Sequence, residues 1–128
     1  MNNTVLIIED DILNMKLVND LLRWRGYQTV QSTTGDDVAE LVATCNPDLI
    51  LMDCQLPVRS GPQIFRSLQA GPAKTQIPVV ILTAFADGNT RDLCREHDCA
   101  AYLQKPFTIP EFFQTVGKYL PGNAMAAA

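Results

Sequence analysis

Acidic side chains, a hydroxyl group and an amine follow four separate apolar runs of this chain. The residues concerned are Glu9, Asp10, Asp53, Thr83 and Lys105. Carboxylates held close together repel one another unless a cation shares their site. Mg²⁺ is the natural cation here, because it prefers oxygen ligands, keeps several waters and takes one or two carboxylates. We therefore expect Asp10 and Asp53 to bind Mg²⁺, and Glu9 to bind it through a water molecule.

Asp53 is the candidate acceptor of a phosphoryl group. Beside a metal-bound donor, its carboxylate would attack phosphorus in line and form an aspartyl phosphate. Lys105 would add positive charge for the equatorial phosphoryl oxygens, and the Thr83 hydroxyl would donate a hydrogen bond to one of them. We predict that Asp53, Thr83 and Lys105 are the catalytic residues, and that Asp53 is the site of phosphorylation.

The same residues predict a conformational switch that responds to phosphorylation of Asp53. A phosphoryl group adds about 1.5–2 negative charges and three strong acceptor oxygens. Thr83 would move toward these oxygens, and Tyr102 would rotate into the space that its loop vacates. The surface formed by the fourth helix, the fifth strand and the fifth helix would then change shape.

Short apolar runs predict the strands that position these groups. The expected strands cover residues 5–8, 27–31, 49–52, 79–82 and 101–104. Continuous apolar runs of this length are typical of strands that are buried on both faces of a parallel sheet.

Segments of helical period separate the apolar runs. Their apolar positions are Leu13, Leu17 and Leu21; Val38, Leu41 and Val42; Ile64, Phe65 and Leu68; and Phe112, Val116 and Leu120. Residues 89–97 form a more polar candidate helix, and Gly26 is expected to end the first helix. Five alternations of strand and helix predict an α/β fold, a doubly wound parallel sheet with helices on both faces. Ligands of such sheets bind beyond the carboxyl ends of the strands, where the candidate residues lie.

Length and composition set the domain organisation. With 128 residues, 47% of them hydrophobic, the chain can bury one core. We expect one domain over residues 1–121 and a disordered tail over 122–128. The net charge of −4 argues against direct nucleic-acid binding. No apolar segment approaches the roughly 20 residues needed to span a bilayer, so we expect no membrane insertion and a cytoplasmic protein.

The candidate residues and their neighbours resemble the bacterial two-component receiver domain. The matching motifs are Glu9-Asp10, Asp53, Leu56-Pro57 before Gly61, Thr83-Ala84 and Lys105-Pro106. The resemblance covers residue 5 to about residue 120. It implies a five-stranded parallel sheet of the flavodoxin-like strand order 2-1-3-4-5, with five helices.

The resemblance also implies partners and further ligands. A histidine kinase or histidine phosphotransfer protein would phosphorylate Asp53, and a downstream protein partner would read the change. The Gln55 backbone carbonyl would join the Mg²⁺ ligands, the Ala84 backbone would bind the phosphoryl group, and the Lys105–Pro106 peptide would be cis. The chain would be no enzyme toward other molecules, and would catalyse only its own phosphorylation and dephosphorylation. A narrower resemblance, carried by motifs such as Leu13–Leu17, Asp53–Pro57 and Thr83–Ala86, is to single-domain regulators of the cell cycle. Met1 close to the first strand favours a single-domain regulator.

Other interpretations of the same residues remain open. A phosphohydrolase of the haloacid dehalogenase type also forms an aspartyl phosphate, but carries a second Asp two places later, where this chain has Gln55. The chain could also be an excised receiver of a hybrid histidine kinase, or a degenerate receiver that only binds proteins. Asp10 or Asp11 could serve as no more than the cap of the first helix.

Overall fold

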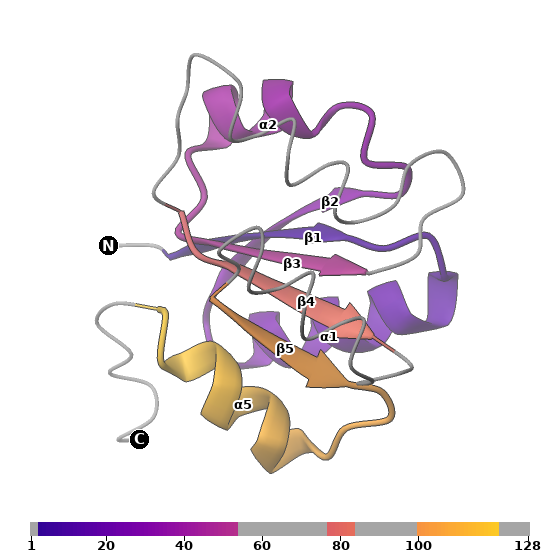
Figure 1. Cartoon of the computed structure of the whole chain (residues 1–128). Helices are drawn as coiled ribbons and strands as arrows, with labels where there is room; N and C mark the ends of the chain where they lie inside the picture. The colour runs from indigo at the N-terminus through magenta and orange to yellow at the C-terminus, as the bar shows by residue number, and fades with distance from the viewer. Residues whose placement is uncertain (1–2, 54–76, 84–99, 121–128) are drawn as a thin grey trace.

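Five parallel strands form a single sheet in the computed structural model, which describes residues 3–53, 77–83 and 100–120 (Figure 1). The strands are β1 (Thr4–Ile8), β2 (Gln28–Ser32), β3 (Leu49–Asp53), β4 (Val79–Thr83) and β5 (Ala101–Gln104). Their order is β2-β1-β3-β4-β5, and each neighbouring pair is parallel. The predicted α/β class, parallel sheet and strand order are confirmed.

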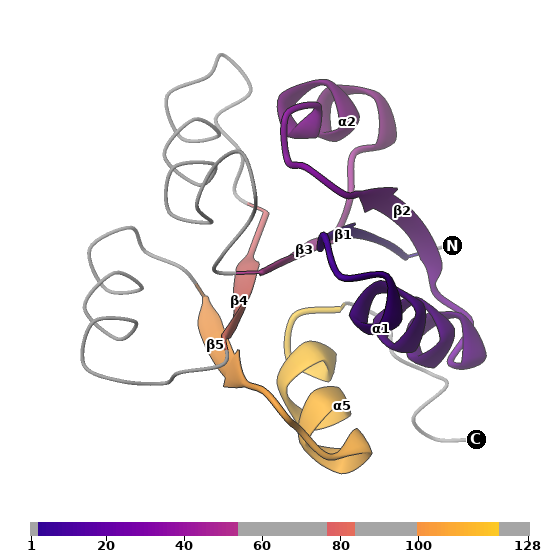
Figure 2. The same cartoon turned by 90° about the vertical axis from the view of Figure 1, so that its right-hand side faces the viewer.

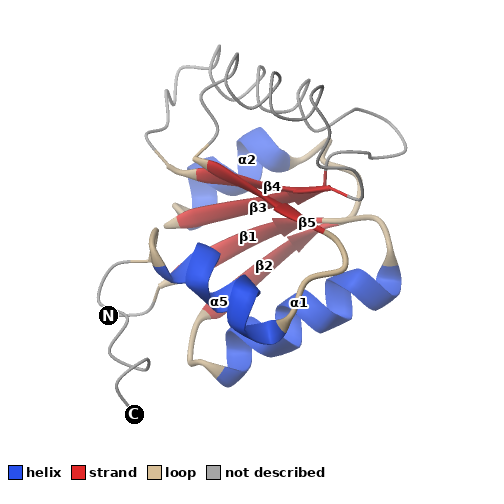
Figure 3. Ribbon diagram, turned by 60° about the horizontal axis from the view of Figure 1, so that its bottom comes forward, coloured by secondary structure: helices blue, strands red, loops and turns tan. Residues whose placement is uncertain are grey.

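Three helices of the described residues cover the sheet. They are α1 (Ile12–Trp24), α2 (Val38–Cys45) and α5 (Ile109–Gly117). Figures 2 and 3 show α1 and α5 together on one face of the sheet and α2 on the opposite face. The predicted helices around residues 64–68 and 89–97, and the predicted tail 122–128, lie outside the described residues. Among the described helices, none has the length and hydrophobicity of a transmembrane segment.

Alternate residues of the buried strands divide the core into two clusters. Val5 and Ile7 of β1 face α1 and α5, whereas Leu6 and Ile8 face α2. This division follows from the strand geometry, in which successive side chains point to opposite faces. Because helices cover both faces, β1, β3 and β4 carry apolar residues at almost every position, as the sequence predicts for strands buried on both faces.

The buried face of α1 differs from the leucine pattern. Leu13 is 77% exposed and Leu17 is 46% exposed. Met15, Val18 and Leu22 are the buried residues, at the spacing of three and four that keeps side chains on one helical face. The leucine spacing thus predicted the helix but not the face that packs on the sheet.

Local signals explain where α1 begins and ends. The Asp11 carboxylate accepts hydrogen bonds from the backbone of Leu13 and Asn14, at 2.9 and 3.1 Å, and caps α1. Gly26 follows the C-cap of α1 with a φ of 89°, a left-handed conformation that favours glycine. The predicted end of the first helix is therefore confirmed.

Candidate functional site

The predicted site residues lie at the carboxyl edge of the sheet. Asp53 and Thr83 are the last residues of β3 and β4. Glu9 and Asp10 follow β1 directly, and Lys105 follows β5. All five end or directly follow strands that run in the same direction, so they meet at one edge of the sheet.

Three carboxylates at this edge lie close enough to share one ion. Single carboxylate oxygens of Glu9, Asp10 and Asp53 all lie within 4.8 Å of one another. Carboxylates are hard oxygen donors, which suit Mg²⁺ better than a thiophilic metal. The donor set therefore fits the predicted magnesium ion.

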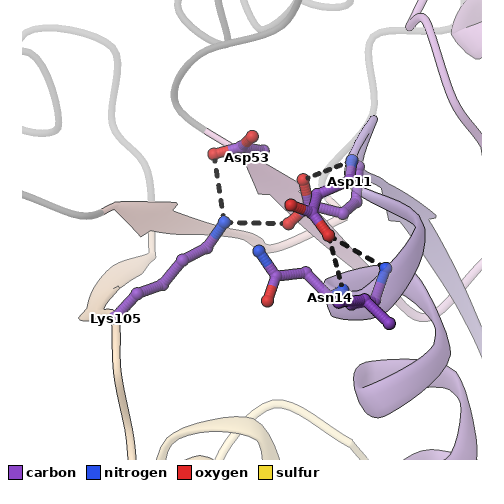
Figure 4. A network of polar contacts seen from close by, with 6 residues as sticks. Asp11, Asn14, Asp53 and Lys105 are labelled. Atoms are coloured by element: carbon purple, nitrogen blue, oxygen red, sulfur yellow. Dashed lines mark hydrogen bonds and ion pairs between the residues drawn. The ribbon is translucent and has the colours of Figure 1, made fainter.

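Lys105 contacts two of these carboxylates. Its Nζ atom donates to Glu9 Oε1 at 2.8 Å and to Asp53 Oδ1 at 3.4 Å. Figure 4 shows Lys105 reaching toward Asp53 from the side of β5, with Asp11 and Asn14 at the start of α1 nearby. The amine and the proposed acceptor thus come together from residues 52 positions apart in the chain.

The surroundings of Lys105 keep its amine protonated. Burial opposes the charged form, but the hydrogen bond to Glu9 and the negative charges of Asp53 and Glu9 outweigh it and raise the pKa of Lys105. Lys105 therefore supplies a permanent positive charge beside Asp53.

Glu9 is buried, whereas Asp10 is exposed. The Glu9 side chain has no solvent exposure, and its Oε2 atom accepts from the backbone N–H of Asp11 at 3.3 Å. The backbone N–H of Glu9 donates to the carbonyl of Ser32, the last residue of β2, at 3.0 Å. These contacts hold the Glu9 carboxylate inside the protein.

The two neighbouring acids after Glu9 have different roles in the structure. Asp11 is the residue that caps α1. Asp10 contributes instead to the group of three carboxylates. The interpretation of one of these acids as a helix cap therefore holds for Asp11.

The predicted switch residues occupy neighbouring strands. Thr83 ends β4 and is 3% exposed. Tyr102 of β5 pairs with Ile81 of β4, is partly buried, and packs against the core cluster on the α2 face. This arrangement brings the two side chains onto adjacent strands, as the predicted switch requires.

Two predicted contributors lie outside the described residues, namely the Gln55 carbonyl and the Ala84 backbone. The predicted cis peptide between Lys105 and Pro106 is present. Sequence reasoning missed the Glu9–Lys105 ion pair and the contact of Ser32 with Glu9. No periodic signal could have revealed either, because each joins the ends of different strands.

Comparison with known proteins finds response regulators, both by family and by individual relatives. The chain matches the response regulator receiver domain family over residues 5–117. It is 40% identical to the polar-differentiation response regulator DivK of Brucella ovis over 120 residues, which make up 94% of this chain and 98% of that protein. DivK of Brucella anthropi has the same identity and coverage.

Solved structures resemble this fold closely. The receiver domain of a sensor histidine kinase from Pseudomonas aeruginosa, which has a magnesium ion coordinated in its active-site cleft, superposes with a TM-score of 0.83. It is 28% identical, and the match covers 93% of this chain and 98% of that one. The chemotaxis protein CheY4 of Vibrio cholerae has a TM-score of 0.87 at 20% identity, with 94% and 100% of the two chains covered, and so shares the fold.

Proposed function

The chain belongs to the family of response regulator receiver domains, and from this premise we propose that it accepts a phosphoryl group on Asp53 in a two-component phosphorelay. The proposal rests on the contact of Lys105 Nζ with Asp53. Asp53 also belongs to the cluster of three carboxylates that could hold a metal ion. This combination supplies an acceptor, a cation site and a fixed positive charge, which are the parts that phosphoryl transfer requires.

Asp10 and Asp53 would hold Mg²⁺, with the Gln55 carbonyl and, through water, Glu9 as further contributors. Bound there, the ion supplies positive charge that lowers the repulsion between the phosphoryl group and the carboxylates. The Asp53 carboxylate oxygen then forms a bond to phosphorus while the bond from phosphorus to the donor imidazole nitrogen breaks. The electron pair of that bond stays on the departing imidazole.

Lys105 and Thr83 would hold the transferred group. The Lys105 ammonium balances charge on the phosphoryl oxygens, and the Thr83 hydroxyl donates a hydrogen bond to one of them. The Ala84 backbone N–H would be a further donor. Because Lys105 already contacts Asp53, it needs little rearrangement to reach a group attached there.

The output would be a change in protein contacts. Movement of Thr83 would allow Tyr102 to rotate, and the surface that includes β5 and α5 would change its affinity for a downstream protein. The donor would be a histidine kinase or a histidine phosphotransfer protein. The likeness to DivK, named as a polar-differentiation regulator, favours a role in cell-cycle or cell-fate control.

A phosphohydrolase of the haloacid dehalogenase type is disfavoured. Its nucleophile would be expected on the first strand, whereas Asp53 ends β3. It would also carry an Asp at the place of Gln55. Turnover distinguishes the two functions, because a hydrolase releases phosphate from small phosphoesters repeatedly and a receiver is labelled once and loses its label slowly.

The proposal is tested by incubating the protein with Mg²⁺ and acetyl phosphate and following its intact mass. Wild type should gain one phosphoryl group, and Asp53→Asn should gain none, because an amide cannot replace the attacking carboxylate. Beryllofluoride should shift the amide spectrum of wild type and leave that of Asp53→Asn unchanged. If wild type gains no mass, or if both proteins behave alike, the proposed function is wrong.

A further inference from the structure

Both carboxylate oxygens of Glu9 have partners within the protein. Oε1 accepts from Lys105 Nζ at 2.8 Å, and Oε2 accepts from the backbone N–H of Asp11 at 3.3 Å. The Glu9 side chain is completely buried, and that of Lys105 is 19% exposed. Glu9 thus faces Lys105 from inside the protein rather than from the solvent.

We propose that Glu9 is a positioning residue that acts through Lys105, holding the ammonium group where it can meet the phosphoryl group on Asp53. The consequence for phosphoryl transfer rests on the proposed function. The ion pair itself belongs to the unphosphorylated protein and can be tested separately.

The distances identify Glu9 as the stronger partner of Lys105. The 2.8 Å contact to Glu9 is 0.6 Å shorter than the 3.4 Å contact to Asp53, and Glu9 is the more deeply buried acid. Ion pairs strengthen as the atoms approach and as water is excluded. The ammonium group is therefore held primarily by Glu9, and Asp53 is its second, longer contact.

Lysine needs such an anchor to act at a defined place. Its four-carbon stem is flexible, and immobilising it costs rotamer entropy. The Lys105 backbone is held by a hydrogen bond from its N–H to the Thr83 carbonyl. Glu9 holds the other end of the side chain, so both ends of Lys105 are fixed at the edge of the sheet.

A buried carboxylate also needs its cation. Removing one member of a buried ion pair leaves an uncompensated charge, which is strongly unfavourable. Glu9 and Lys105 therefore stabilise each other in the absence of any metal ion. On this view the effect of Glu9 on phosphorylation passes through Lys105, and contact with Mg²⁺ through water is secondary.

The first test is a double-mutant cycle of Glu9→Gln and Lys105→Met, with phosphorylation by acetyl phosphate at saturating Mg²⁺. Glu9→Gln should slow phosphorylation of wild type by about tenfold, as expected for loss of a charge-assisted hydrogen bond. In the Lys105→Met background the same change should have less than about a twofold effect. Equal effects in both backgrounds would show that Glu9 acts independently of Lys105 and would overturn the proposal.

The second test observes the Lys105 ammonium directly, without a phosphodonor or metal. In ¹H–¹⁵N spectra of Lys105 Nζ at low temperature, wild type should give a slowly exchanging signal, which Glu9→Gln removes and Asp53→Asn preserves. The opposite pattern, a signal that survives Glu9→Gln, or no slowly exchanging signal in wild type contradicts the proposal. Because this spectrum needs no phosphorylation, it decides about Glu9 even if Asp53 proves not to accept a phosphoryl group.

Thermal unfolding confirms that each variant is folded before it is measured. If Glu9→Gln does not fold, Glu9→Asp replaces it, since the shorter side chain keeps the charge but withdraws the carboxylate from Lys105. Glu9→Asp should then give faster exchange of the Lys105 ammonium than wild type, and unchanged exchange contradicts the proposal.

Discussion

The backbone N–H of Lys105 donates a hydrogen bond to the carbonyl oxygen of Thr83 at 2.6 Å. This bond continues the pairing of β4 and β5 beyond Thr83 and Gln104, the last pair in register. The two side chains proposed to hold the phosphoryl group therefore extend from directly bonded backbone segments. Movement of Thr83 on phosphorylation would be transmitted to β5, where Tyr102 lies.

Thr83→Ala should slow phosphorylation by acetyl phosphate by roughly 10–100-fold, because a hydrogen bond to a charged group contributes about 1.5–3 kcal/mol. Quenched-flow or intact-mass measurements at saturating Mg²⁺ give the rate. Thr83→Ser keeps the hydroxyl group and should stay within about threefold of wild type. Equal rates for Thr83→Ala and wild type would exclude a hydroxyl contact in the rate-limiting step.

Substitution of Asp10 and substitution of Asp11 should affect different properties, namely metal binding and the stability of α1. Asp11→Ala should lower the free energy of unfolding by about 1 kcal/mol, because it removes the N-cap of α1. Asp10→Ala should weaken Mg²⁺ binding by about tenfold or more, given that even outer-shell groups of metal sites contribute about 10–100-fold. Urea unfolding and calorimetric Mg²⁺ titration check the two effects. The interpretation is wrong if Asp11→Ala weakens metal binding more than Asp10→Ala does.

Leu22→Ala and Leu13→Ala make the same change on the two faces of α1. Leu22 is completely buried, so its truncation should lower the free energy of unfolding by about 2–5 kcal/mol. Leu13 is 77% exposed, and its truncation should change that free energy by no more than about 0.5 kcal/mol. Urea denaturation measures both variants. Similar losses for both variants would mean that the face of α1 with Leu13 also packs on the sheet.

The capping box of α5 should give a pH-dependent contribution to stability. Thr108 and Glu111 exchange side-chain to backbone hydrogen bonds at 3.0 and 3.2 Å. Hydrogen bonds from the backbone and side chain of Thr108 lower the pKa of Glu111 below its ordinary value of 4.5. A lowered carboxyl pKa stabilises the fold above the ordinary value, and this contribution is lost as pH falls through the lowered pKa.

Glu111→Gln tests this directly, because Gln can occupy the same place in the capping box without a charge. The stability difference between wild type and Glu111→Gln should be constant above the ordinary pKa and should shrink on further acidification. Thermal unfolding across the acid range gives the difference. A difference that grows as the pH falls would contradict the assignment.

Strand positions were predicted well because buried strands consist largely of apolar residues, which can be recognised in the sequence. The predicted strand 101–104 coincides with β5. The predicted strands 49–52 and 79–82 stop one residue short, since Asp53 and Thr83 are polar but still pair with neighbouring strands. Apolar patterns report which side chains are buried, whereas a strand ends where its backbone hydrogen bonds end.

Sequence alone determined the α/β class, the alternation of strands and helices, and the placement of Asp53 and Lys105 at strand ends. These features follow from periodicity and residue type, which are local properties of the chain. The tertiary structure decided that Lys105 contacts Glu9, 96 residues away, more closely than it contacts Asp53. It also decided which face of α1 is buried. Both outcomes depend on how distant elements pack against one another, and no local pattern encodes the distance between two side chains brought together by strand order.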